Sequence, residues 1–230
     1  CQMMKYGQIA GNSSINAMIY HCFEYLCDED EQKFVKKFQE QPDDSDQITH
    51  TFSELVLGAY LCSRGFRVRH DYVINDQTPD WSILDAEGQA IEGIVELTNF
   101  HIDKATENQV EEQMRAKGIT GYWRDQNKDN VERLYHAIWR KATKYRSLIE
   151  ELQAPYVVGV FGKFKAVVDF EEVCFCLFDK KTGLFGMYPE LSGVLYFEES
   201  SGQYSFNYAS NPRALRRIEL PTGIFPSEAA

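Results

Sequence analysis

The chain has 230 residues, of which 43% are hydrophobic, and these include 15 Phe, 13 Tyr and 3 Trp. This length predicts a single domain, and the apolar content is enough for a full core, which excludes global disorder. The net charge of -11 argues against binding to polyanions through the overall field. Any contact with nucleic acid therefore requires a local basic patch.

The six cysteines predict buried, reduced thiols rather than a zinc site or a disulfide framework, because they form no Cys-x-x-Cys pair. No basic segment leads into an apolar stretch near the N-terminus, and no run approaches the ~20 apolar residues of a membrane span. These features predict a cytoplasmic protein that makes no membrane contact. The chain begins with Cys1 rather than Met, so we expect its native start to be missing or altered.

The first predicted elements are helical. Amphipathic patterns predict short helices over 15–27 and 31–39, and QPDDSDQ at 41–47 is a polar connector. A strongly apolar helix is predicted from Thr49 to Arg64, with Gly65 as its C-terminal cap.

Strands follow this helix. The segment from Phe66 to Ile74 is typical of a strand, and a hairpin is predicted with strands at 79–85 and 90–98. Residues 101–130 are polar and predict at most a weak helix. A second long helix is predicted over 131–153, where Pro155 ends it.

The last third of the chain is predicted to be rich in strands. YVVGVFG at 156–162 is a continuous apolar run, typical of a strand covered on both faces. Residues 168–178 favour a short helix, and VLYFEE against QYSFNY, with SSG between them, predicts a final hairpin.

The order of elements predicts an α/β fold, in which a helix connects the antiparallel hairpin to a later strand. We expect one domain over 1–230. Its parts are a helical extension (1–47), a core (48–162), and a C-terminal helix with a β-hairpin (163–230).

The central hairpin carries two carboxylates, Asp80 and Glu96. Alternation puts Val95 and its odd-numbered neighbours on the packing face, and Glu96 and its even-numbered neighbours on the more polar face. If the loop has an odd number of residues centred on Gly88, paired positions sum to 176. Asp80 then lies opposite Glu96, with Cβ atoms ~5 Å apart.

Two like charges at this separation repel by roughly 3 kcal/mol at an effective dielectric constant of 20. A stable protein tolerates such a pair by exposing it, by protonating one carboxyl group, or by binding a cation between the two. Taken alone, the pair slightly favours a solvated hairpin face.

Each long helix adds one candidate group. Glu54 is the only charged residue from Thr51 to Ser63, near a helix N-terminus, where the helix dipole favours a carboxylate. In the second helix, Lys141 interrupts an apolar stripe, so its ammonium group either reaches acids or extends to water along the stripe. The stripe has spacings of 4, 3, 4, 3 and 4 and comprises Leu134, Ile138, Lys141, Tyr145, Leu148 and Leu152.

Three acids and an inward lysine are the groups that metal-dependent phosphodiester hydrolysis requires. Carboxylates hold a hard cation such as Mg²⁺, a positive charge stabilises the phosphate, and another group orients the attacking water.

These residues resemble the motif of the PD-(D/E)xK, or restriction-endonuclease-like, nuclease superfamily. Pro79-Asp80 and Glu96-Leu97-Thr98 occupy the motif's two strands, and Glu54 lies on the preceding helix. Thr98 replaces the motif's lysine. Some members carry a Gln-x-x-x-Tyr signature on the following helix, and the segment from Lys141 to Tyr145 is similar to it.

The resemblance covers roughly residues 49–162. It implies a restriction-endonuclease-like core of a helix, a three-stranded antiparallel or mixed sheet, a helix and a strand. It also implies a Mg²⁺-dependent nuclease that acts on DNA, with Mn²⁺ able to replace Mg²⁺. The implied metal ligands are Asp80, Glu96 and Glu54, and Thr98, Lys141 and Tyr145 complete the catalytic set, with Lys141 supplying the displaced ammonium group.

A nuclease of this kind needs local basic contacts, and one that cuts both strands often acts as a homodimer. Lys144 is expected on the surface of its helix. The candidate basic contacts are Arg140, Lys144, Arg146, Lys163, Lys165, Arg213, Arg216 and Arg217.

The alternative is a catalytically inactive domain of the same fold that binds nucleic acid or protein. Thr98 and the net charge favour it, and the aromatic final hairpin (Tyr196, Phe197, Tyr204, Phe206, Tyr208) is its candidate interface. An unrelated hydrolase or transferase lacks sequence support. His50, His70, His101 and His136 have no compelling partners in the sequence, and His101 is the one nearest to the proposed site.

Overall fold

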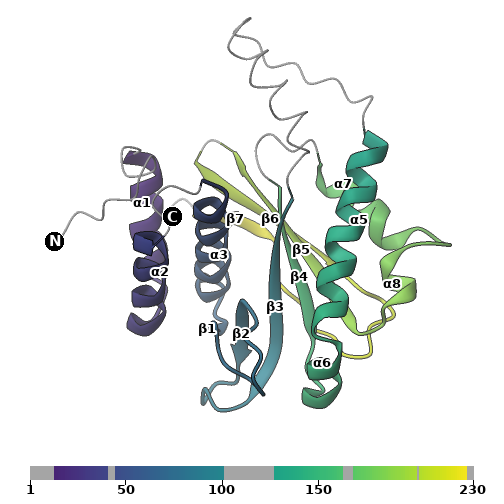
Figure 1. Ribbon diagram of the computed structural model, residues 1–230, viewed down its shortest axis with the longest axis horizontal. Helices are drawn as coiled ribbons and strands as arrows, with labels where there is room; N and C mark the ends of the chain where they lie inside the picture. Colours follow the sequence, from purple (N-terminus) through teal and green to yellow (C-terminus); the bar gives the residue numbers. More distant parts are fainter. Residues whose placement is uncertain (1–12, 41–44, 101–126, 163–167, 201, 227–230) are drawn as a thin grey trace, which may run out of the picture. The chain divides into compact units, whose positions relative to one another are not determined.

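The computed structural model describes residues 13–40, 45–100, 127–162, 168–200 and 202–226 (Figure 1). Helices and strands mix along the chain, which confirms the α/β class. The chain divides into two compact units, residues 1–96 and 97–230, which are described separately. The single domain with the three predicted parts stays a prediction.

The first unit begins with three helices, close to the predicted ranges. They are α1 (Ser13–Phe23), α2 (Asp28–Glu40) and α3 (Ser45–Ser63). Both α1 and α2 contact α3. Helix α3 is largely buried, and the predicted cap Gly65 follows it in the left-handed conformation with φ of 87°. The N–H of Phe66 donates to the carbonyl oxygen of Leu61 at 3.1 Å, which satisfies a terminal carbonyl group.

Three antiparallel strands follow: β1 (Arg67–His70), β2 (Trp81–Leu84) and β3 (Ile91–Phe100). Strand β1 ends four residues before the predicted Ile74. Asp71, Asn75 and Asp76 have positive φ, a conformation that Asp and Asn tolerate in turns. The sequence therefore turns where strand propensity alone favours extension.

The predicted hairpin register is confirmed between Trp81 and Ile83. Trp81 pairs with Val95 and Ile83 with Gly93, so paired positions sum to 176. The odd-numbered loop from which this register was derived is wrong. The N–H of Asp85 donates to the carbonyl oxygen of Ala90 at 2.9 Å, which leaves an even-numbered loop over 86–89. The register shifts after Ile83, because Leu84 pairs with Ile91. This shift makes the even-numbered loop compatible with the predicted alignment of Trp81 with Val95.

The predicted one-sided burial of β3 is wrong for its central residues. Residues Gly93 through Leu97 are all buried. Helix α3 approaches the face that carries Trp81, whose indole N–H donates to the carbonyl oxygen of Glu54 at 3.0 Å. Ser82, Ile94 and Glu96, on the other face, are also shielded from solvent. The strand therefore lies in the core rather than at a solvated surface.

The packing of Trp81 against Gly58 predicts that Gly58→Ala destabilises the protein, whereas helix propensity alone predicts that this substitution stabilises it. An added Cβ at Gly58 would lie 1.9 Å from the Trp81 ring. We expect Gly58→Ala to lower the free energy of unfolding by about 2 kcal/mol, although Ala is the better helix former by about 1 kcal/mol. Urea denaturation measures this change. Trp81→Phe removes the clashing ring and should abolish the effect of Gly58→Ala, whereas a stabilised Gly58→Ala single variant contradicts the packing.

The second unit begins with the helix predicted over 131–153, which is divided in two. Helix α5 spans Asn127–Lys144 and α6 spans Arg146–Leu152. The interruption lies at Tyr145, which has φ of -108° and ψ of 21°. The Thr143 hydroxyl donates to the carbonyl oxygens of Trp139 and Arg140, both at 3.1 Å, and such bonds bend helices.

The remaining strands confirm the predicted β-rich tail. Strand β4 (Tyr156–Gly162) is buried throughout and pairs in parallel with β5 (Leu191–Ser200). Strand β6 (Gln203–Ser210) pairs antiparallel with β5, as the final hairpin predicted, and with β7 (Gly223–Phe225). The core of this unit includes Phe197 and Phe206, whose rings stack with centroids 4.6 Å apart.

Two short helices complete the second unit. Helix α7 (Phe170–Phe178) agrees with the helix predicted over 168–178, and its N-terminal capping box joins Asp169 and Glu172. Helix α8 (Leu184–Met187) had no predicted counterpart. The five described cysteines form no disulfide. Cys22 and Cys176 are buried as predicted, whereas the prediction of burial is wrong for the exposed Cys27 and holds only in part for the half-buried Cys62 and Cys174. Within the described ranges, no helix combines the length and apolarity needed to cross a bilayer.

Candidate functional site

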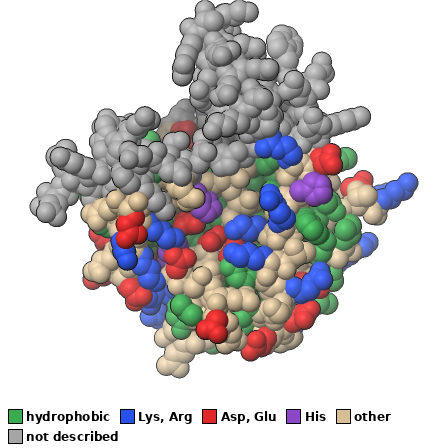
Figure 2. All heavy atoms as spheres, viewed as in Figure 1, with side chains coloured by type: hydrophobic (Ala, Val, Ile, Leu, Met, Phe, Trp, Pro, Cys, Tyr) green, Lys and Arg blue, Asp and Glu red, His purple; other side chains and the backbone are tan. Residues whose placement is uncertain are grey.

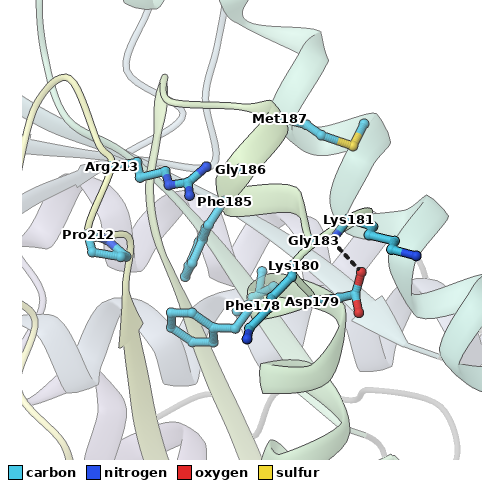
Figure 3. A pocket seen from close by; sticks show the side chains of 11 residues that line it. Phe178, Asp179, Lys180, Lys181, Gly183, Phe185, Gly186, Met187, Pro212 and Arg213 are labelled. Carbon is cyan, nitrogen blue, oxygen red and sulfur yellow. Dashed lines mark hydrogen bonds between the residues drawn. The ribbon is translucent and has the colours of Figure 1, made fainter.

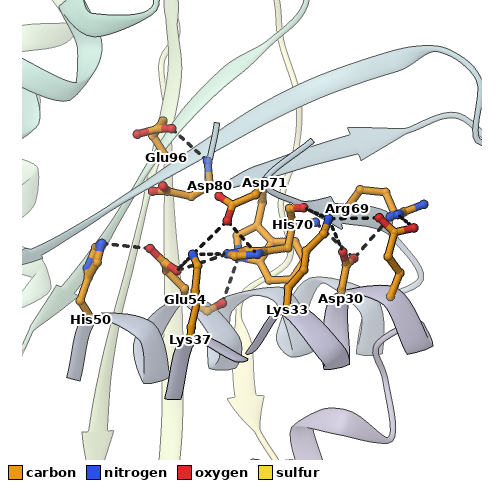
Figure 4. A network of polar contacts seen from close by, with 12 residues as sticks. Asp30, Lys33, Lys37, His50, Glu54, Arg69, His70, Asp71, Asp80 and Glu96 are labelled. Atoms are coloured by element: carbon orange, nitrogen blue, oxygen red, sulfur yellow. Dashed lines mark hydrogen bonds and ion pairs between the residues drawn. The ribbon is translucent and has the colours of Figure 1, made fainter. Parts of the chain in front are cut away.

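Asp80 and Glu96 lie side by side, as the register predicts (Figure 4). Asp80 directly precedes β2, and its backbone N–H donates to Oε1 of Glu96 at 3.0 Å. The Asp80 carbonyl oxygen accepts from the N–H of Asp71 at 3.2 Å. The backbone of Asp80 is thus fixed between the end of β1 and a side chain of β3.

Burial of Glu96 excludes the solvated hairpin face. Glu96 is 0% exposed and Asp80 is half-buried. Water therefore does not reach the Glu96 side of this carboxylate pair, and a buried charge needs hydrogen bonds or an opposite charge. The Asp80 amide supplies one such hydrogen bond to Glu96. Protonation of one carboxyl group or a cation bound between the two carboxylates would also relieve the repulsion.

Glu54 belongs to an ion network on the helical side of the first unit. Its Oε1 is 3.0 Å from Nε2 of His50, and its Oε2 is 3.2 Å from both Nε2 of His70 and Nζ of Lys37. Lys37 comes from α2, His50 and Glu54 from α3, and His70 from β1. Lys37 also pairs with Asp71 at 3.0 Å. The network therefore ties three elements together (Figure 4).

The network controls the charge of Glu54. Burial by itself would raise the pKa of the Glu54 carboxyl group, but hydrogen bonds from His50 and His70 and the Lys37 ammonium group lower it well below its usual range. Burial by itself would lower the pKa of Lys37, but the carboxylates of Glu54 and Asp71 raise it overall. Both groups are therefore held in their charged forms.

The lowered pKa of Glu54 predicts a pH dependence of stability. The contribution of Glu54 is complete above the unfolded-state pKa of about 4.3 and is lost as pH falls through the lower folded-state pKa. We expect the stability advantage of wild type over Glu54→Gln to shrink below about pH 4.3. Urea midpoints at pH values from neutral to acid measure it, and a constant difference over that range contradicts the assignment.

A second buried acid extends the network. Asp30 of α2 is 1% exposed, and its Oδ1 is 3.2 Å from Nζ of Lys33. Its Oδ2 accepts from the backbone N–H of His70 at 3.2 Å and lies 3.5 Å from Nε of Arg69. The His70 ring is itself 0% exposed and packs on Phe34 with centroids 4.3 Å apart. These contacts fix β1 against α2.

Thr98 lies in a basic cavity of about 300 Å³ in the second unit. Thr98, Asn99 and Phe100 come from β3, and the other lining residues come from α5. The lining contains two arginines, one histidine and no carboxylate among its described residues. The residues from α5 are Arg133, His136, Ala137 and Arg140.

Lys141 and Tyr145 occupy the predicted stripe, whose other members are buried except for the half-buried Leu152. Lys141 is half-buried, and its carbonyl oxygen accepts from the Tyr156 hydroxyl at 2.6 Å. Tyr145 is buried. Lys144 is exposed as expected, and its ammonium group lies over the Tyr145 ring, 4.5 Å from the centroid.

The predicted residues fall into both units. Glu54, Asp80 and Glu96 belong to residues 1–96, whereas Thr98, Lys141 and Tyr145 belong to residues 97–230. The structure brings Asp80 and Glu96 together and places Glu54 in the ion network. The convergence of all six side chains stays a prediction. Three other predicted candidates, His101, Lys163 and Lys165, lie outside the described residues.

The sequence prediction missed Lys37, His50, His70 and Asp71. The expectation that His50 and His70 lack compelling partners was wrong, because both contact Glu54. The spacing of His50 and Glu54 is i,i+4, which places two residues on one helix face and could have indicated this pair. Lys37 and His70 are distant in sequence from Glu54, and no local pattern joins them.

The donor set fits a hard cation with two protein ligands. Mg²⁺ commonly takes one or two carboxylates and completes its shell with water and substrate phosphate, and Asp80 with Glu96 offers such a pair. Both oxygens of Glu54 already face protein donors, which favours an indirect role for this residue. Among the described residues, no group of three or more His, Cys, Asp or Glu side chains is arranged to hold a metal ion.

Comparison with known proteins gives no relative. No protein-family model, curated protein or solved structure matches the chain. The class established for the described residues is thus α/β, and the assignment of a function depends on the geometry of the site.

Proposed function

We propose that the protein is a metal-dependent nuclease that hydrolyses phosphodiester bonds of DNA. One observation carries the proposal: the hairpin register holds a fully buried Glu96 against the amide of Asp80. A fold gains no stability from burying one carboxylate beside a second, because both lose hydration and repel each other. A divalent cation that binds both groups offsets this cost.

Asp80 and Glu96 are the proposed ligands of Mg²⁺ or Mn²⁺. When bound, the ion polarises the phosphate and lowers the pKa of a bound water. Glu54, held ionised by Lys37, His50 and His70, contributes negative potential and fixes β1 and α3 beside the metal ligands.

Thr98, Lys141 and Tyr145 have proposed roles at the substrate. Thr98 lies two residues beyond Glu96, on the same face of β3 by alternation, and its hydroxyl can hydrogen-bond to a water or to a phosphate oxygen. Lys141 supplies the ammonium group that β3 lacks because Thr98 replaces the motif's lysine. This group stabilises the negative charge that develops on the phosphate. Tyr145 packs one turn further along and positions that lysine.

The basic cavity around Thr98 supports a nucleic-acid substrate. Arg133 and Arg140 are suited to phosphate because a guanidinium group donates two parallel hydrogen bonds to an oxyanion. Acidic and basic side chains are interspersed on the face seen in Figure 2. Contact with a polyanion by a chain of net charge -11 therefore depends on such local groups.

Cleavage assays with Mg²⁺ or Mn²⁺ on double-stranded DNA, single-stranded DNA and RNA test the proposal. Glu96→Gln retains an acceptor for the Asp80 amide but removes the charge, so we expect cleavage to fall by about a hundredfold. Glu92→Gln, at an exposed position of the same strand, is the matched control and should retain activity. Circular dichroism verifies folding. Equal metal-dependent activity in wild type and Glu96→Gln would falsify the proposed role of Glu96.

A catalytically inactive binding module is the second candidate. The lack of a three-ligand cluster among the described residues favours it, as does Thr98 in place of the motif's lysine. Calorimetric titration with Mn²⁺ separates the two functions. A nuclease binds the ion at the carboxylate pair, whereas an inactive module gives no binding heat and still retains a nucleic-acid or protein partner.

A further inference from the structure

A second basic hollow lies at the turn between α7 and α8, wholly within residues 97–230 (Figure 3). Its volume is about 530 Å³, within the ~300–1,000 Å³ of small-molecule sites. The buried side chains of Leu177 and Phe185 contribute apolar surface, and Phe178 and Met187 are exposed. The hollow shares no lining residue with the cavity around Thr98.

The charge of the hollow is opposite in sign to that of the whole chain. Lys180, Lys181 and Arg213 line it, against one carboxylate, Asp179. Within the described residues, none of these three cationic side chains forms an ion pair. By contrast, Arg146 lies 3.8 Å from Glu190. The hollow therefore offers positive charge to an anion.

The carboxylate of Asp179 stabilises the turn through three hydrogen bonds. Its Oδ1 accepts from the backbone N–H groups of Lys181 and Thr182 and from the Thr182 hydroxyl, at 2.9, 2.8 and 2.8 Å. A Cβ at Gly183 would lie 2.5 Å from the carbonyl oxygen of Asp179, so the turn is too tight for a larger residue. In Figure 3, Lys180 points toward the Phe178 ring, while Lys181 points away from it.

Phe178 adds an aromatic surface to the site. Its ring packs edge-on against Phe185, with centroids 5.0 Å apart and planes at 86°, and Phe178 is 48% exposed. The guanidinium group of Arg213 lies beside Gly186, where an added Cβ would be 3.4 Å from Nη1. An exposed ring next to cations matches a ligand that has both an aromatic plane and a phosphate.

We propose that this hollow binds a single nucleotide unit, with the base on Phe178 and the phosphate on Lys180 and Arg213. An inorganic anion would leave the aromatic and apolar surface unused, and a neutral aromatic molecule would leave the cations unused. The ligand is a free mononucleotide or one nucleotide of a single strand, which share this chemistry. The proposal does not depend on the carboxylate pair of the first unit.

Isothermal titration of the full chain tests the site, with AMP, adenosine, inorganic phosphate and a short single-stranded DNA as separate probes. We expect AMP to bind more tightly than adenosine or phosphate. Arg213→Gln and Phe178→Leu should each weaken AMP binding by about tenfold. If the single strand binds more tightly than AMP and responds to the same variants, the ligand is a nucleotide within a strand; if AMP binds at least as tightly, it is a free nucleotide.

Matched controls lie near the tested residues in the sequence. Arg216→Gln removes a charge near Arg213, and Phe175→Leu removes an exposed ring of α7, but neither residue lines the hollow. Lys180→Gln is an independent variant should Arg213→Gln fail to fold. Lack of AMP binding, equal affinity for phosphate alone, or equal losses in the control variants would overturn the proposal.

Discussion

Asp80→Asn is expected to reduce Mg²⁺-dependent cleavage by about 10²–10³-fold in kcat. Asn has the shape of Asp, and its backbone N–H still donates to Glu96, so the hairpin register is preserved. The substitution removes one of the two charges that the proposed cation requires. Steady-state cleavage at several Mg²⁺ concentrations measures the loss, and saturation should also require more Mg²⁺ than in wild type.

Asp76→Asn is the matched control for this experiment. Asp76 is exposed, lies in the turn before Asp80, and has a positive φ that Asn tolerates well. We expect its cleavage rate to equal that of wild type. If Asp80→Asn and Asp76→Asn have the same activity and the same Mg²⁺ requirement, Asp80 is not a metal ligand.

Glu54→Gln is expected to lower the free energy of unfolding by about 3 kcal/mol at neutral pH. The carboxylate is 5% exposed and faces Lys37, His50 and His70. Its neutralisation leaves the Lys37 ammonium group with Asp71 as its remaining ion-pair partner and weakens the contacts to both imidazoles. Urea denaturation measures the change.

Glu40→Gln provides the comparison on a neighbouring helix. Glu40 pairs with Lys36 at 3.7 Å, and both side chains are exposed, so its loss should cost less than about 1 kcal/mol. A double-mutant cycle of Glu54→Gln with Lys37→Met should show positive coupling, because each single variant breaks the same pair. Additive effects, or equal effects of Glu54→Gln and Glu40→Gln, contradict a stabilising network.

Local patterns predicted the elements that depend on local chemistry. The apolar helix ending at Gly65 and the final hairpin are both observed. The register that pairs Trp81 with Val95 was also predicted, although the loop and the irregularity of β3 differ from the expected turn. Burial of Ile94 and Glu96 was not predicted, because the alternation of β3 indicates one polar face and tertiary packing shields both.

The site was predicted only in part, for a physical reason. Asp80 and Glu96 are linked by strand pairing, which sequence symmetry about a turn can reveal. Glu54 meets Lys37 and His70 through the packing of α2 and β1 on α3, and no periodicity encodes that packing. The interruption at Tyr145 likewise depends on the hydrogen bonds of the Thr143 hydroxyl, which the spacing of hydrophobic residues does not reveal.

The most direct measurement is anomalous diffraction from crystals of the wild-type protein soaked in Mn²⁺. We predict a manganese peak in contact with carboxylate oxygens of both Asp80 and Glu96, and its absence from Asp80→Asn crystals treated in the same way. Wild-type crystals without a peak at this pair, or with manganese bound only elsewhere, would contradict the central claim.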